Sequence, residues 1–253
     1  MRDFTLSIYI KLLKTMQDAG YTAQTFQDFL HNPHPKAVIL RHDVDRTPKN
    51  ALAFARVESE MGLLATYYFR IVPVTFKPDI IKEIAALGHE IGYHYEDMDL
   101  FHGDIERAHK SFTQNLIRLR ELVSVNTICM HGSPLSKWDN KVIWKYFNYH
   151  DLNIVGEPYF DVDYHKVFYL SDTGRKWNNV GASIRDKVDT GFDINVDSTF
   201  HMIDLFKEGM LPDQIMINSH PHRWHNGYLR WFGEFTQQGI KNIVKRHIIR
   251  ING

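Results

Sequence analysis

The chain has 253 residues, enough for one large α/β barrel or two smaller domains, and its 30 lysines and arginines balance its 30 aspartates and glutamates. This balance leaves no net field to recruit an anionic membrane, and no basic stripe interleaved with aromatic residues is present, so we expect no nucleic-acid partner. The single cysteine, Cys129, excludes an intrachain disulfide and a thiolate metal cluster.

The N-terminal region gives no targeting signal. Charged residues interrupt every apolar run of the first 30 residues, and no small-residue cleavage site follows them. No apolar stretch is long enough to predict a membrane span. We therefore expect a cytoplasmic protein. Histidine is the compositional outlier with 15 residues, which favours metal chemistry because imidazole is a common ligand for zinc and related ions.

Apolar spacing and turn residues predict alternating helices and strands in the first half of the chain. A helix over residues 6–17 precedes Gly20, and a short helix covers residues 25–30. Predicted strands then lie at 38–40, 65–72, 90–95 and 127–130, with helices at 47–61, 78–87 and 104–123. Thr47 is the predicted N-cap of the first of these helices, with Pro48 at its first position.

The pattern is less regular beyond Gly132. Predicted helices lie at 140–147, 198–207 and 228–246, and predicted strands at 153–155, 167–170 and 214–218. Repeated strand-then-helix units predict parallel strands with right-handed crossovers, in a barrel or an open doubly wound sheet. The sequence contains no repeat or Pro/Gly/Ser-rich linker, so we expect one domain. Its expected parts are an N-terminal helical extension (1–34), a barrel (37–224) and a C-terminal helix (226–253).

Polar clusters follow the predicted strands at the points where these strands end. They occupy residues 42–45, 94–97, 130–133, 171–177 and 219–222. The carboxyl ends of parallel strands converge on one face, so we expect the clusters to meet there. Asp43 and Asp45 are two positions apart and share a side of an extended strand. Carboxylate and imidazole groups without thiolates favour a catalytic divalent ion over a structural zinc site.

Each of these features also has a plainer structural interpretation. Residues 42–45 could form a solvated loop that caps the next helix, although two carboxylates beside an imidazole are more charge than a cap needs. His94 could be a core histidine bonded to a backbone carbonyl. His131 could be the polar first residue of a turn, since Gly and Pro follow it. We favour the metal site over these alternatives.

At these residues the sequence resembles the polysaccharide deacetylase family, the NodB-like metal-dependent carbohydrate esterases. The resemblance rests on the HDVD strand end at 42–45, the GHEIGYH stretch at 88–94 and the late His220, and it spans roughly residues 38–222. It implies a distorted, often incomplete barrel. The expected fold class is therefore α/β, a single-domain distorted (β/α) barrel of the NodB-like type, with packing helices at both ends.

The resemblance also implies roles for individual residues. Asp43, the first carboxylate of the motif, would be the general base, and Asp45, the second, a metal ligand. His94 matches the first histidine of the family's metal-binding pair. His220 matches the histidine that protonates the leaving amine.

Two parts of the family pattern are missing. The second metal histidine would fall four residues after His94, where this chain has Met98, whose thioether is a poor ligand for a hard or borderline ion. The arginine-proline motif is replaced by His-Gly-Ser-Pro at 131–134. The possible substitute ligands are Glu96, Asp97, His102 and His131. We favour His131 because its strand-end position places it on the active face.

Further residues are candidates for substrate contacts. His42 would orient one of the carboxylates or contact substrate. Asp172, Arg175 and Trp177 together offer a planar ring for a sugar face beside groups that bind hydroxyls or phosphate.

The expected function is a metal-dependent amide hydrolase that removes an N-acyl group, such as acetyl, from a sugar or sugar-like intermediate in surface-polysaccharide biosynthesis. We expect one divalent ion; zinc suits the ligands best, and iron, cobalt, nickel and manganese are compatible with them. The partner is a small-molecule or glycan substrate, and the oligomeric state is not predicted. Two alternatives stay open: hydrolysis of another non-peptide C–N bond, such as a cyclic amide, and a non-catalytic carbohydrate- or metal-binding module.

Overall fold

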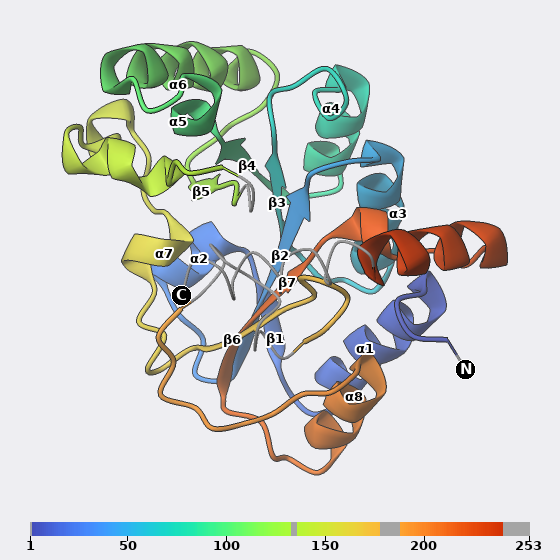
Figure 1. Cartoon of the computed structure of the whole chain (residues 1–253). Coiled ribbons are helices and arrows are strands. Elements are labelled where there is room, and N and C mark those ends of the chain that lie inside the picture. Colours follow the sequence, from blue (N-terminus) through green and yellow to red (C-terminus); the bar gives the residue numbers. More distant parts are fainter. Residues whose placement is uncertain (1, 133–135, 178–187, 240–253) are drawn as a thin grey trace.

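The centre of the computed structural model, which describes residues 2–132, 136–177 and 188–239, is a parallel sheet (Figure 1). Its strands are β1 (Thr22–Gln24), β2 (Ala37–Val44), β3 (Thr66–Phe69), β4 (Glu90–Tyr95), β5 (Ile128–Met130), β6 (Phe168–Ser171) and β7 (Gln214–Ser219). The order is β5-β4-β3-β2-β7-β6, with β1 paired to β2. Over the described ranges β5 and β6 do not pair with each other, so the barrel is incomplete.

Helices surround this sheet (Figure 1). They are α1 (Leu6–Asp18), α2 (Phe26–His31), α3 (Pro48–Glu60), α4 (Pro78–Ala86), α5 (Asp97–Leu100), α6 (Ile105–Arg120), α7 (Pro158–Asp161) and α8 (Thr199–Lys207), with 3₁₀ helices η1 (Asn140–Lys145), η2 (Tyr149–Leu152) and η3 (Pro221–Arg223). Residues 228–239 form a further helix. The predicted distorted (β/α) barrel with helices at both ends is confirmed. None of the described helices is long and apolar enough to cross a membrane.

Strand β2 is paired along both of its sides. On one side β7 pairs with Ala37 through His42. On the other side β1 pairs with Ala37 through Ile39, and β3 pairs with Arg41 through Val44. Strand β1 was not predicted from the sequence, because it has three residues and no clear alternation. Because β2 has neighbours over its whole length, the direction of each of its side chains is fixed.

The side chains of β2 alternate between two apolar clusters. Val38, Leu40 and Val44 pack in the larger cluster, which includes the residues of the surrounding helices. Ala37 and Ile39 pack in a smaller cluster inside the barrel. A strand has a side-chain period of two, so Arg41 and Asp43 face the barrel interior, while His42 faces the helices.

His42 therefore belongs to a buried polar network between β2 and the helices. Its Nε2 donates a hydrogen bond of 2.7 Å to Oε1 of Glu58 on α3, and both side chains are fully buried. Tyr9 and Tyr67 donate their hydroxyl protons to the same carboxylate. This placement corrects the prediction that His42 orients the catalytic carboxylates or contacts substrate, because it lies on the opposite face of the strand.

Two predicted local features also differ from the structure. Thr47 has a left-handed backbone (φ 47°) and makes no side-chain cap to α3. The predicted strand at 153–155 is not formed: Asn153 is left-handed, and an isolated bridge joins Thr127 to Gly156 instead. The C-terminal helix predicted for 228–246 is present through residue 239, and the rest of that range lies outside the described residues.

Glu58 is expected to stabilise the fold as a charged group. Burial alone would raise its pKa, but the charge and hydrogen bond of His42 bring the pKa below its ordinary value. A carboxylate whose pKa is lower in the folded protein than in the unfolded chain stabilises the fold when the pH is above its unfolded-state pKa. This stabilisation is lost as the pH falls through the pKa of the folded state. Glu58→Gln should therefore reduce the free energy of unfolding by about 3 kcal/mol at neutral pH, with a smaller loss below about pH 4.

Urea unfolding of wild type and variant at both pH values measures this difference. The control is Glu60→Gln at the exposed end of the same helix, which should change stability little. An equal loss at both pH values would contradict a charged Glu58.

Candidate metal centre and active site

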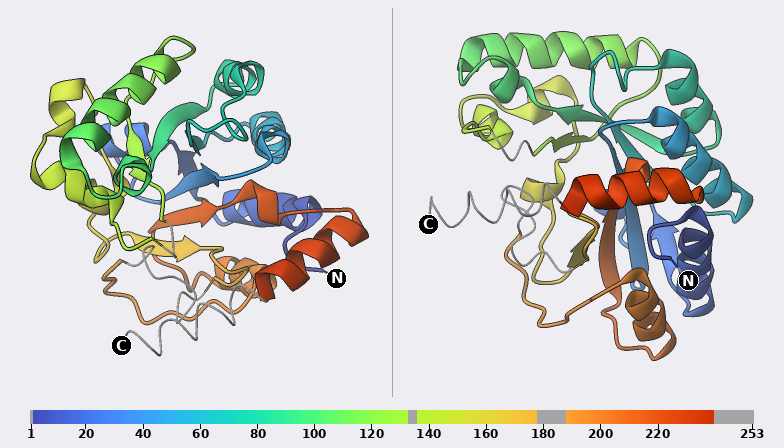
Figure 2. Two further views of the ribbon diagram at one scale, coloured as in Figure 1. Left: turned by 45° about the horizontal axis from the view of Figure 1, so that its top comes forward. Right: turned by 45° about the vertical axis from the view of Figure 1, so that its right-hand side comes forward.

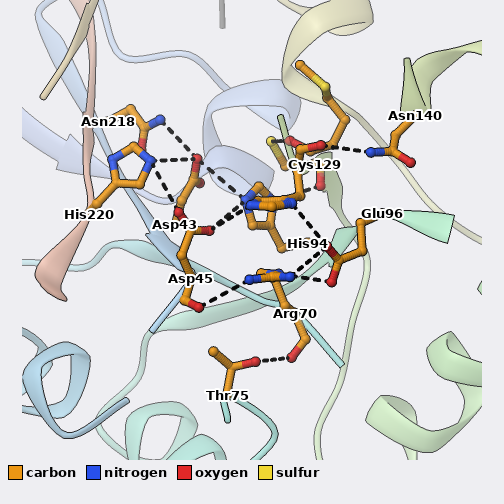
Figure 3. Close-up of polar contacts among 12 residues, drawn as sticks. Asp43, Asp45, Arg70, Thr75, His94, Glu96, Cys129, Asn140, Asn218 and His220 are labelled. Atoms are coloured by element: carbon orange, nitrogen blue, oxygen red, sulfur yellow. Dashed lines mark hydrogen bonds and ion pairs between the residues drawn. The ribbon is translucent and has the colours of Figure 1, made fainter. Parts of the chain in front are cut away.

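The carboxyl ends of β2, β4, β5 and β7 bring together the five residues predicted to bind metal or to catalyse. His94 Nε2 lies 3.4 Å from Oδ1 of Asp45, and His131 Nε2 lies 3.6 Å from the same oxygen. His220 Nε2 lies 3.9 Å from Oδ2 of Asp43 and 3.8 Å from Oδ2 of Asp45. Figure 3 shows Asp43 and Asp45 between His94 and His220.

Asp45, His94 and His131 have the chemistry and spacing of a metal site. One ligand atom from each lies within 4.8 Å of the others. Tetrahedral ligands about 2.0–2.1 Å from zinc lie about 3.3 Å apart. The distances of 3.4 and 3.6 Å from Oδ1 of Asp45 to the two histidines are close to this value. That oxygen is buried and has no hydrogen-bond partner among the described residues. Three nitrogen and oxygen ligands with a further position for water suit a catalytic ion.

A second set of possible ligands shares His94 with the first. Its members are Asp43, His94 and Cys129, whose ligand atoms also lie within 4.8 Å of one another. In this set both carboxylate oxygens of Asp43 already accept hydrogen bonds from Arg41. The set with Asp45 and His131 is therefore the better candidate.

Both candidate histidine ligands have a partner on the ring nitrogen that faces away from Asp45. Nδ1 of His94 donates a 2.9 Å hydrogen bond to the carbonyl oxygen of Cys129, which leaves Nε2 as the free nitrogen. Nδ1 of His131 lies 3.1 Å from Oε2 of Glu96. Such outer partners typically fix the orientation of metal-binding histidines.

Arg70 connects this outer layer to β2 (Figure 3). Its guanidinium donates hydrogen bonds of 2.9 and 2.7 Å to the two oxygens of Glu96, and Nη1 donates one of 3.3 Å to the carbonyl oxygen of Asp45. Burial would raise the pKa of Glu96, but the close contact with His131 and the hydrogen bonds from Arg70 bring it to about 2. Glu96 is thus an ionised partner of His131. Arg70 was not predicted as a site residue; its signal in the sequence is one charge at the end of an apolar strand.

Asp43 is held rigidly in the barrel interior. Arg41 donates to both of its oxygens, at 3.0 and 2.8 Å, and Nδ2 of Asn218 donates to Oδ2 at 3.0 Å. Burial would raise the pKa of Asp43, but the charge of Arg41 brings it to about 2. Arg41 and Asn218 were not predicted as site residues. Arg41 is two positions before Asp43, so it shares a side of the strand with Asp43 and Asp45.

Asp172 contacts His220 and is not exposed to a substrate. Its fully buried carboxylate accepts hydrogen bonds from Nδ1 of His220 at 2.6 Å and from the His220 backbone at 2.9 Å. Arg223 and Trp224 donate to the same carboxylate, each at 2.8 Å. Burial would raise the pKa of Asp172, but the charges of His220 and Arg223 bring it below its ordinary value. Asp172 therefore orients His220, which corrects its predicted role as a substrate contact.

Trp177 and Arg175 are packing residues in the structure, contrary to the prediction of substrate contacts. Trp177 is 1% exposed, and its Nε1 donates a hydrogen bond of 2.9 Å to Thr199. The Arg175 guanidinium lies over the ring of Phe4 at 4.9 Å and over Trp231 at 5.1 Å. Neither side chain has a contact with the predicted ligands.

The other possible substitutes for the missing histidine lie elsewhere. Asp97 is buried and accepts hydrogen bonds from Tyr93 and Ser111. His102 is exposed in the loop after α5. Met98 packs in the large apolar cluster. Of the possible substitutes, His131 thus lies closest to Asp45. Residue 133 of the predicted cluster 130–133 lies outside the described residues.

Comparison with known proteins shows distant similarity in fold. No protein-family model matches the sequence, and no curated protein matches it. A CE4 family pseudoenzyme from Bacillus anthracis is similar, with 12% identity and a TM-score of 0.48 over 82% of this chain, which spans 63% of that protein's length. A CE4 esterase from Streptococcus mutans is similar with 13% identity and a TM-score of 0.47, covering 94% of this chain and 91% of that one.

The Xyl-CE4 domain of a multidomain xylanase from the hindgut metagenome of Trinervitermes trinervoides is also similar. It has 12% identity and a TM-score of 0.42, with 83% of this chain and 84% of that chain covered.

Metal binding should require the three proposed ligands. After incubation with zinc and removal of excess metal, we expect about one ion per wild-type chain and loss of that ion in Asp45→Ala and His131→Ala. Glu96→Gln should weaken binding about 10- to 100-fold, because it removes the outer partner of a ligand. Elemental analysis and competition with a chelating dye measure both effects.

The matched control is His109→Ala, which alters a histidine stacked on Phe147 outside the site. It should keep wild-type metal content. Unchanged zinc affinity in His131→Ala would show that this histidine is not a ligand.

Proposed function

We propose that the protein is a metal-dependent hydrolase that removes an N-acyl group, such as acetyl, from a sugar or sugar-like molecule. One observation carries this proposal: an ionised carboxylate, Asp43, and an oriented imidazole, His220, lie beside the candidate ligands Asp45, His94 and His131. A metal-binding protein without turnover has no evident need for these two groups on neighbouring strands.

The candidate ligands would hold one divalent ion, for which we propose zinc. Bound there, it would polarise the acyl carbonyl and make water more acidic at neutral pH. The remaining chemistry belongs to side chains of this protein.

Asp43 is placed to accept a proton from the attacking water. Its oxygens are fixed by Arg41 and Asn218, so the carboxylate keeps its position while the water oxygen forms a bond to the acyl carbon. Preorganised groups of this kind avoid the cost of reorientation during the reaction. A base in this position typically contributes about 10²- to 10⁴-fold to the rate.

His220 is placed to protonate the leaving nitrogen. Asp172 accepts the proton of Nδ1, so Nε2 is the atom that faces Asp43 and Asp45. When the C–N bond breaks, the bond electrons go to nitrogen, and a proton from Nε2 of His220 completes the amine. The proton that Asp43 took from the water then replaces it on Nε2, which lies 3.9 Å from Oδ2 of Asp43. The products are the free acid and the amine, which together contain the atoms of the amide and one water.

The carbohydrate class of the substrate is supported by the family-like residues at 42–45 and 88–94. With them we propose a cytoplasmic site of action and a place in surface-polysaccharide biosynthesis. Hydrolysis of the amide of an N-acetylated sugar is the reaction to test first.

The test uses zinc-loaded protein with a panel of N-acetylated sugars and nucleotide-activated N-acetyl sugars, and measures released acetate. We expect release that a chelator abolishes and zinc restores. Asp43→Asn and His220→Ala should each lower kcat/KM by about 10²- to 10⁴-fold while keeping the bound metal. The control Asp204→Asn, on the exposed side of α8, should keep wild-type activity.

Two results would contradict the proposal. Wild-type turnover in Asp43→Asn would show that this carboxylate is not the base. A folded, metal-bound protein that hydrolyses none of the amides would favour the binding-module alternative.

A further inference from the structure

The candidate ligand His131 directly follows a strand at the edge of the sheet. This strand, β5, has three residues, and within the described ranges β4 is the one strand that pairs with it. A short edge strand is held less firmly than a central one, because the backbone groups on its free side lack a neighbouring strand. A metal ligand must keep its position to within about 0.5 Å. Contacts outside the sheet are therefore needed to fix the backbone at His131.

The first of these contacts comes from the segment that leads into α7. In Figure 2 this segment, yellow-green to yellow, lies on the side of β5 away from β4. Ile128 at the start of β5 donates its backbone N–H to the carbonyl oxygen of Gly156, at 3.1 Å. The next carbonyl oxygen, that of Glu157, already accepts from Phe160 and Asp161 in α7, so it is not available to β5. Backbone pairing along this side thus ends one step before His131.

The side chain of Glu157 continues the pairing where the backbone cannot. Its Oε1 accepts the backbone N–H of Met130, the last residue of β5, at 3.0 Å. Its Oε2 accepts the N–H of Tyr159 at 2.6 Å, as the N-cap of α7. The carboxylate is fully buried, so its removal would leave the N–H of buried Met130 without an acceptor. One carboxylate thus joins the end of the edge strand to the start of a helix.

The backbone on the other side of the ligand is fixed by Asn140, which Figure 3 shows beside Glu96. Its Nδ2 donates a hydrogen bond of 2.8 Å to the carbonyl oxygen of His131. Its Oδ1 accepts the N–H of Asp99 in α5, at 3.1 Å, and the side chain is 2% exposed. Because α5 follows the strand that carries His94, this amide connects the two segments that supply the histidine ligands.

We propose that Glu157 and Asn140 are positioning residues for the candidate metal site. They hold the backbone before and after His131, while the N–H of His131 itself donates to the carbonyl oxygen of Tyr95 at 2.8 Å. Neither side chain touches the metal; each acts through the strand end that carries the ligand. The inference rests on the proposed function only in that it takes His131 as a ligand.

Zinc affinity of the full chain, measured by competition with a chelating dye, tests this proposal without a substrate. Asn140→Ala and Glu157→Ala should each weaken zinc binding about 10- to 100-fold, as the loss of outer partners typically does. Glu157→Gln should fall between Glu157→Ala and wild type, because its single oxygen can face the N–H of either Met130 or Tyr159 but not both. With cobalt(II) in place of zinc, the visible spectra of these variants should shift towards that of His131→Ala, because they depend on ligand geometry.

The matched control is Glu90→Ala, at the other end of the same strands. The Glu90 carboxylate accepts hydrogen bonds from Thr66 and from Thr127, which directly precedes β5. Its loss should lower the free energy of unfolding while zinc affinity stays at the wild-type value. Urea unfolding checks that every variant is folded. If Glu157→Ala does not fold, Glu157→Gln replaces it, with an expected loss of affinity of about tenfold.

Wild-type zinc affinity in Asn140→Ala and Glu157→Gln, together with loss of zinc in His131→Ala, would overturn the inference and leave the metal site intact. Equal weakening in Glu90→Ala would also overturn it, because any loss of stability would then have the same effect. Zinc retained in His131→Ala would instead contradict the ligand itself, and with it the proposed site.

Discussion

The alternation of side chains along β2 is the constraint on which the rest of the site depends. With neighbours on both sides, β2 cannot shift by one residue without exchanging its two faces. This register places Arg41 and Asp43 inside the barrel, with Asp45 at its mouth, and directs His42 to Glu58 in the helix layer. The buried pair of His42 and Glu58 thus packs on the helix side of the strand, while the other face holds the candidate site.

The candidate metal site takes one of its ligands from a second strand, because the position four residues after His94 is Met98, whose thioether is a poor ligand. His131 comes from the next strand, β5, and its distant ring nitrogen lies against Glu96. Arg70 joins Glu96 to the backbone of Asp45, so one guanidinium connects the loops that follow β2, β3 and β4. His131 and His94 lie on different strands, so the distance between them is not set by the geometry of one segment. The contacts through Glu96 and Arg70 hold His131 in place.

The sequence predicted much of the fold and the candidate site because both depend on short-range patterns. Strands that end in polar residues converge on one face of a parallel barrel, which brings Asp43, Asp45, His94, His131 and His220 together. The predictions failed where a distant partner determines the role of a side chain. His42 turns to Glu58, and Asp172 is enclosed by His220, Arg223 and Trp224, contacts that no local pattern encodes.

Anomalous diffraction from crystals soaked in zinc would test the central claim most directly, because it locates the ion without reference to a substrate. The account predicts one peak about 2.0–2.2 Å from Oδ1 of Asp45 and from Nε2 of both His94 and His131. A peak bound by Asp43, His94 and Cys129, or no peak at these strand ends, would contradict the proposed site.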